Sequence, residues 1–179
     1  EQLYKAPDVL IRAVAQCLAS GLDLELVLVG DGKFRPALEI LAQQLGIADR
    51  VRFRGMLPAG AAVRAELDAA DVFVLPSRTE GLPRAMVEAM ARGLACIGSA
   101  VGGIPELLAP EDMVPPGDEE ALAHKILEIV TDRQRMARMS VRNFQKAKEY
   151  HADKLRERRV RFYRHIRRTT EDWLRKNHE

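Results

Sequence analysis

SRTEGLPRAMVEAM, residues 77–90, follows directly on a short apolar run at 72–75 and on Pro76. The apolar run contains the β-branched and aromatic residues that strands favour, and its length suits a buried strand. Gly81 gives the loop beyond it a flexible point. The stretch therefore predicts a buried strand, a short loop and a helix that begins near Pro83.

The predicted helix lacks a side-chain cap. Pro83 suits the first turn of a helix, whose N–H groups have no intrahelical acceptor, and Leu82, the expected capping residue, carries no side-chain oxygen. The backbone N–H groups of Arg84 and Ala85 are therefore expected to point at whatever lies in front of the sheet. An uncapped helix N-terminus behind a buried strand predicts an anion-binding site.

Two carboxylates, Glu80 in the loop and Glu88 in the helix, are expected to face the same region. The ordinary explanation for such a pair is an exposed loop residue and a solvated helix position. Their place at the end of a buried strand favours a functional role, because open α/β sheets bind ligands there.

Composition indicates one globular domain. The chain has 179 residues, 47% of them hydrophobic and 30% charged, which is enough to bury a core, and no apolar stretch is long enough to cross a bilayer. Cys17 and Cys96 lack metal-ligand spacing and are interpreted as small core residues in a reducing, cytoplasmic compartment. The chain begins at Glu1 rather than methionine, which suggests part of a longer protein.

Predicted strands and helices alternate along the chain. Strands are expected at 24–29, 51–54, 72–75, 95–98 and 113–114, and helices at 7–20, 34–45, 60–70, from 83, and at 118–131, 133–149 and 153–175. This alternation predicts an α/β fold, a Rossmann-like parallel sheet with helices on both faces. We divide the chain into this domain, residues 1–150, and a basic amphipathic C-terminal helix, residues 151–179.

Glycines follow successive predicted strands at Gly32, Gly55, Gly81 and Gly103. The carboxyl ends of parallel strands share one edge of a sheet, so these loops are expected to lie together. Each glycine could simply make a turn, but their coincidence predicts a phosphate-bearing ligand, with Gly103 among its contacts. No intact Gly-x-Gly-x-x-Gly or Walker motif is present, which argues against a nicotinamide or P-loop site.

Six motifs carry a family resemblance in the same order along the chain: LVLVGDG (26–32), VRFRG (51–55), ADVFVLPS (70–77), EGLP (80–83) through EAMARG (88–93), VGGIPE (101–106) and VPPGD (114–118). Together they resemble the C-terminal, donor-binding half of family 4 retaining glycosyltransferases, enzymes of the GT-B fold. The resemblance covers residues 5–150. It also implies a first strand, a glycine-rich loop and an arginine that this sequence does not contain.

The resemblance implies roles for the residues that match it. Glu80 would contact the donor sugar near its reacting face, Glu88 would hold the ribose hydroxyls, and Lys5 would neutralise the diphosphate. Further donor contacts are implied for the backbone after Glu80 (Gly81, Leu82, Pro83, Arg84) and for Met56 and Leu57 beside the base. Pro83 departs from the glycine of many relatives and removes one N–H, which affects the contacts to the sugar.

The implied activity is transfer of a sugar from a nucleotide diphosphate sugar, with retention and with no metal or cofactor. The acceptor would bind to an N-terminal domain that this chain lacks, so the chain alone is expected to be inactive. Two other classes stay open: a GT-B-like nucleotide-sugar epimerase, which would need catalytic histidines near the sheet, and a non-catalytic nucleotide or nucleic-acid binding module. Neither accounts for Glu80 and Glu88, and no nucleic acid is expected as a partner.

Residues 151–179 contain ten Lys and Arg residues against five acidic ones, whereas residues 1–150 contain 18 against 21. An apolar face at Leu155, Phe162, Ile166 and Trp173 runs among these arginines. We expect Trp173 to pack the last helix onto the domain. The helix would cross to the N-terminal domain, or its basic face would touch an anionic membrane on the cytoplasmic side. A solvated charged face is the alternative.

Overall fold

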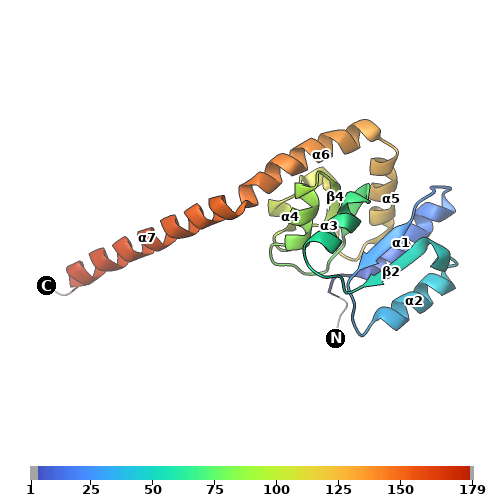
Figure 1. Cartoon of the computed structure of the whole chain (residues 1–179), viewed down its shortest axis with the longest axis horizontal. Helices are drawn as coiled ribbons and strands as arrows, with labels where there is room; N and C mark the ends of the chain where they lie inside the picture. The colour runs from blue at the N-terminus through green and yellow to red at the C-terminus, as the bar shows by residue number, and fades with distance from the viewer. Residues whose placement is uncertain (1–3, 178–179) are drawn as a thin grey trace.

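A computed structural model describes residues 4–177 and shows alternating helices and strands followed by a helical C-terminal part (Figure 1). The elements are α1 (Pro7–Ala19), β1 (Leu26–Val29), α2 (Arg35–Gln44), η1 (Ala48–Arg50), β2 (Val51–Gly55), α3 (Ala61–Asp68), β3 (Val72–Leu75), α4 (Arg84–Ala91), β4 (Ala95–Ser99), η2 (Ile104–Glu106), η3 (Pro110–Asp112), β5 (Met113–Val114), α5 (Glu119–Val130), α6 (Arg133–Ala147), η4 (Lys148–Tyr150) and α7 (Ala152–Asn177). The α-helices and strands agree with the predicted ones to within about two residues, the usual uncertainty of element ends.

The strands pair in parallel, as predicted, but in two ladders. β1 pairs with β2, with Leu26 opposite Val51, while β4 lies between β3 and β5, with Val72 opposite Ala95 and Gly98 opposite Met113. No ladder joins β1 to β3 within the described residues. Within the described residues the parallel strands therefore form two ladders, one of β1 and β2 and one of β3, β4 and β5.

Helices cover both faces of the sheet, and the alternation of side chains along β4 shows how. Ala95 and Ile97 belong to a buried cluster with residues of α1 and α5, while Cys96 belongs to a second cluster with Met86 and Met90 of α4. Successive strand residues point to opposite faces, so a strand that is apolar throughout must be covered on both. β4 is buried along its whole length, and the predicted fold class is confirmed.

The start of α4 differs by one residue from the prediction. Pro83 is the N-cap with extended backbone angles (φ −76°, ψ 108°), and Arg84 is the first helical residue. Leu82 is therefore outside the helix, as expected for a residue whose α conformation is disfavoured by the proline after it. No side chain caps α4, which agrees with the uncapped N-terminus that the sequence predicts.

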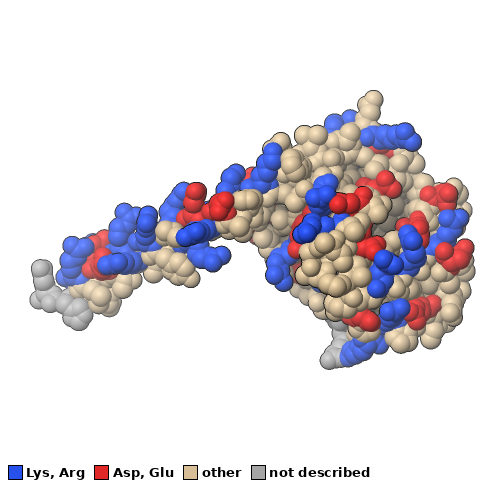
Figure 2. All heavy atoms as spheres, in the orientation of Figure 1, with Lys and Arg blue, Asp and Glu red and all other residues tan. Residues whose placement is uncertain are grey.

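The C-terminal helix α7 projects from the rest of the molecule (Figure 1). None of its residues is buried, and Trp173 is 60% exposed, so the expectation that Trp173 packs this helix onto the domain is wrong. The physical reason is the direction that α7 takes after η4, which carries it away from both cores. Lys and Arg side chains line the projection (Figure 2). Within the described residues, no helix is both long and apolar enough to cross a membrane.

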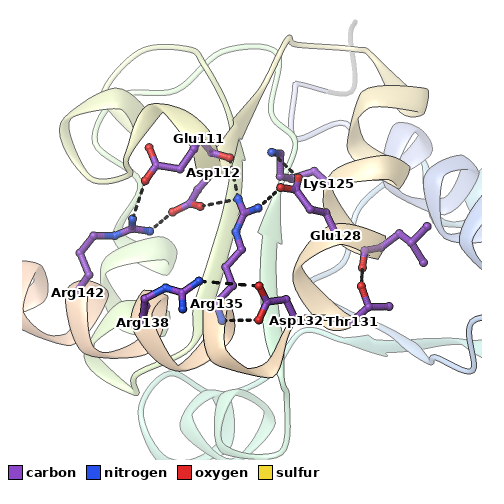
Figure 3. A network of polar contacts seen from close by, with 10 residues as sticks. Glu111, Asp112, Lys125, Glu128, Thr131, Asp132, Arg135, Arg138 and Arg142 are labelled. Atoms are coloured by element: carbon purple, nitrogen blue, oxygen red, sulfur yellow. Dashed lines mark hydrogen bonds and ion pairs between the residues drawn. The ribbon is translucent and has the colours of Figure 1, made fainter.

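A polar network fixes η3 against α6 (Figure 3). The Asp112 carboxylate is 1% exposed and accepts from Arg135 (3.3 Å) and from Arg142. Arg135 also donates to the backbone carbonyl of Glu111 (3.1 Å) and pairs with Glu128 at the end of α5. A buried carboxylate is costly unless it is paired, so these two arginines hold the segment after β4 at its far end.

Candidate functional site

Glu80 lies in the loop after β3, and two side chains hold its carboxylate. The Ser77 hydroxyl donates to Glu80 Oε1 over 2.7 Å, and Lys5 Nζ forms an ion pair with the same oxygen. Ser77 is fully buried, and the Glu80 side chain is only 7% exposed, whereas that of Lys5 is 44% exposed. The predicted residues Lys5 and Glu80 thus meet, although 75 positions separate them.

The segment that carries Lys5 is tied to the Glu80 loop on both sides of Lys5. The backbone N–H of Arg78 donates to the Tyr4 carbonyl over 2.7 Å, and the Arg78 guanidinium makes two hydrogen bonds to the Asp8 carboxylate, of 3.0 and 3.3 Å. The hydrogen bond to Asp8 raises the pKa of Arg78 above its ordinary value. Such bidentate contacts fix orientation as well as distance.

Sequence reasoning missed Ser77, Arg78 and Asp8 as parts of this site. A serine three residues before Glu80 is a signal that could have been used, because a hydroxyl so close in the chain can reach the carboxylate. The Arg78–Asp8 contact joins residues 70 positions apart, so no local sequence pattern predicts it.

The N-terminus of α4 faces outward beside this loop. Gly81, Leu82, Arg84 and Ala85 are exposed, while Pro83 is buried. The N–H groups of the first helical turn have no intrahelical acceptor, and α4 has no side-chain cap. The helix dipole adds a partial positive charge there. The helix begins four residues after Glu80, whose carboxylate pairs with the cationic Lys5. The N-terminus of α4 and Lys5 can hold an anionic group, and the Glu80 carboxylate can accept hydrogen bonds from a neighbouring group that carries hydroxyls.

The other predicted contacts occupy distinct places. Glu88 is exposed on α4, open to a ligand. Met56 is 76% exposed and follows Gly55, whose carbonyl accepts from the N–H of Gly30 (2.8 Å); Leu57 beside it is half-buried. Met56 and Leu57 therefore lie at the carboxyl end of the β1–β2 ladder, whereas Glu80 follows β3 of the other ladder.

Gly103 is buried, and its N–H is already engaged. It donates to the Gly81 carbonyl over 2.9 Å, so the loop after β4 touches the Glu80 loop through backbone atoms. Within residues 4–177, no group of three or more His, Cys, Asp and Glu side chains could hold a metal ion. In the described part of the chain, the candidate site thus combines one fixed carboxylate, one exposed carboxylate, a lysine and the uncapped first N–H groups of α4.

Comparison with known proteins places the chain in a family. Residues 1–132 match the model of the family described as glycosyl transferases group 1, well over half of the chain. The chain belongs to this family, as the sequence resemblance predicts.

Curated relatives and a solved structure agree with this assignment. The chain is 36% identical over 133 residues to the putative colanic acid biosynthesis glycosyltransferase WcaL of Salmonella typhimurium, covering 69% of this chain and 32% of the relative. It is 33% identical over 144 residues to a GDP-mannose-dependent phosphatidylinositol monomannoside mannosyltransferase of Corynebacterium glutamicum, covering 75% and 37%. The structure of Anabaena HepE in complex with UDP superimposes with a TM-score of 0.76 at 26% identity, over 96% of this chain and 46% of that one.

The chain thus spans about a third of the length of these curated relatives. Its fold is that of one half of a GT-B glycosyltransferase.

Proposed function

We propose that this chain is the donor-binding half of a retaining glycosyltransferase that moves a sugar from a nucleotide diphosphate sugar. The observation that carries the proposal is the meeting of Lys5 and Glu80 beside the uncapped N-terminus of α4. Lys5 and the helix N-terminus suit a diphosphate. The Glu80 carboxylate, which accepts hydrogen bonds only, suits sugar hydroxyls.

In the proposed reaction, the bond between the anomeric carbon and the diphosphate oxygen breaks as the acceptor hydroxyl oxygen bonds to the same face of the sugar, and the hydroxyl proton passes to the departing diphosphate. Negative charge gathers on the departing diphosphate, and fixed positive charge at that position is where stabilisation counts most. Lys5 and the N–H groups of Arg84 and Ala85 would supply it. Lys5 would exchange its ion pair with Glu80 for one with the phosphate.

Glu88 is proposed to bind the ribose hydroxyls, because it is an exposed carboxylate about one helical turn after Arg84, the first residue of α4. Met56 and Leu57 are proposed to border the base. The HepE structure contains UDP, while the Corynebacterium relative is named for GDP-mannose. Both nucleotides are therefore reasonable probes of this chain.

The acceptor is proposed to bind to an N-terminal domain of the whole protein. The two cysteines, both free and buried, are consistent with a cytoplasmic enzyme. We further propose that the basic side of α7 meets an anionic membrane surface, since Arg161, Arg164 and Arg168 share one side at helical spacing and no residue of the helix is buried.

Calorimetric titration with UDP, GDP and ADP, each alone and as its sugar conjugate, tests the donor assignment. The Glu88→Ala variant should bind the preferred nucleotide about tenfold more weakly, the loss expected for hydrogen bonds to a charged group. Glu120→Ala is the matched control, because Glu120 is an exposed glutamate in the first turn of α5. Equal affinities for wild type and Glu88→Ala would remove Glu88 from the site.

A further inference from the structure

We propose that Gly102 and Gly103 are positioning residues that set the backbone of the Glu80–Leu82 loop. This inference rests on the proposed function, because it concerns the loop that would hold the donor. In this proposal, the two glycines act on the Glu80–Leu82 loop and need not touch the ligand themselves. Their role is to allow a backbone-to-backbone approach that no other residue permits.

The two loops are in direct backbone contact. A Cβ on Gly102 would lie 1.9 Å from the Glu80 carbonyl oxygen and 2.7 Å from its carbon. A Cβ on Gly103 would lie 2.8 Å from the Gly81 oxygen and 3.0 Å from Leu82 Cα. Every one of these neighbours is a backbone atom, so a side chain could not be accommodated by a change of rotamer. The loop itself would have to move.

Gly102 is required for a second reason. Its φ angle is +52°, in the left-handed region that other residues rarely adopt. This conformation turns the chain so that the next residue, Gly103, can donate its N–H to the Gly81 carbonyl over 2.9 Å. That bond leaves the exposed edge of the Glu80–Leu82 loop to a ligand.

Packing and ion pairs hold the segment that follows the two glycines. Ile104 is fully buried and packs in one cluster with Met86 of α4 and with Leu107 and Leu108. Further along, Asp112 is held by Arg135 and Arg142 (Figure 3). The segment after β4 is thus fixed at both ends, while Ser77 and Lys5 hold the Glu80 side chain from the other direction. The loop after β4 therefore sets the backbone of Glu80, while Ser77 of its own loop and Lys5 of the segment before α1 set its carboxylate.

Comparison of Gly102→Ala with Gly46→Ala tests the proposal. Gly46 also has a positive φ, +70°, but an added Cβ there meets nothing within 4 Å, so it reproduces the conformational cost without the collision. Amide hydrogen exchange at Gly103 should be slow in the wild type and in Gly46→Ala and fast in Gly102→Ala. Affinity for UDP-glucose or GDP-mannose should fall about tenfold in Gly102→Ala and less than about twofold in Gly46→Ala.

A second variant covers the case in which Gly102→Ala does not fold. Gly103 has a φ of −87°, so Gly103→Ala introduces a collision with the Gly81 carbonyl without conformational strain. It should show the same fast exchange at residue 103 and the same loss of donor affinity. Slow exchange and unchanged affinity in the folded variants would overturn the positioning role. If the wild type binds no nucleotide sugar, the proposed function fails instead, and hydrogen exchange still decides whether the glycines set the loop.

Discussion

The Ser77 hydroxyl donates a 2.7 Å hydrogen bond to Glu80, and the serine is completely withdrawn from solvent. The bond fixes one oxygen of the carboxylate that we place against the donor sugar. It also explains how the Glu80 side chain can be mostly buried although its neighbours Thr79 and Gly81 are exposed, because a buried carboxylate needs hydrogen-bond donors.

Ser77→Ala should therefore destabilise the protein by about 1–2 kcal/mol and weaken binding of nucleotide sugars, since the Glu80 carboxylate loses a donor. Ser99→Ala is the matched control: Ser99 ends the neighbouring strand β4 and is equally buried, but its hydroxyl has no partner among the described residues. Removal of that hydroxyl should be neutral or stabilising. Urea denaturation of the two variants measures the difference, and equal losses would contradict the role of Ser77.

The Asp112 network predicts an asymmetry among the arginines of α6. Arg135→Met should lower the free energy of unfolding by about 2 kcal/mol, less than the full cost of an unpaired buried carboxylate because Arg142 remains. Arg138→Met should change it by less than about 0.5 kcal/mol, since Arg138 is 68% exposed and only reaches Asp132 at 3.9 Å. Chemical denaturation distinguishes the two, and a larger effect at Arg138 would show that the network is not what fixes η3.

Cys96 predicts a loss of stability in alkali. Burial raises the pKa of its thiol from 9.0 to about 12 in the folded protein. The unfolded chain releases the thiol proton first, so the stabilising contribution is complete below about pH 9 and is lost as the pH rises towards about 12. Denaturation curves of the wild type and of Cys96→Ala, measured from about pH 8 to about pH 11, should converge with rising pH. Parallel curves would show that the thiol ionises equally in both states.

The basic side of α7 predicts binding to anionic vesicles. The chain should sediment with phosphatidylglycerol vesicles and not with phosphatidylcholine vesicles, less so at high salt. Replacement of Arg161, Arg164 and Arg168 by Gln should weaken this binding by about 1 kcal/mol per arginine.

A variant that removes the same charge from the body of the protein, at Arg50, Arg52 and Arg54, controls for net charge in the vesicle experiment. Equal weakening in both variants would mean that α7 has no special part in membrane contact. Retention of RNA in preference to vesicles would favour a nucleic-acid partner instead.

The sequence predicted the order of helices and strands well, because apolar runs at strand spacing and glycines at their ends are local signals. It also predicted that Lys5 and Glu80 belong to one site, but only through the family resemblance, since 75 residues separate them. The split of the strands into two ladders, the exposure of Trp173 and the Arg78–Asp8 contact depend on how distant segments pack. Gly103 as a ligand contact stays a prediction. The bond from its N–H to the Gly81 carbonyl could not be predicted from spacing in the sequence, because it joins two separate loops.

The most direct test of the central claim is an NMR titration of the isotope-labelled chain with UDP-glucose and GDP-mannose, which detects weak binding residue by residue. The account predicts that the amide signals of Gly81, Leu82, Arg84 and Ala85 shift on addition of a nucleotide sugar, and that Lys5→Met abolishes these shifts at the same concentration. Shifts confined to other parts of the chain, or none at these four amides, would contradict the placement of the donor at the N-terminus of α4.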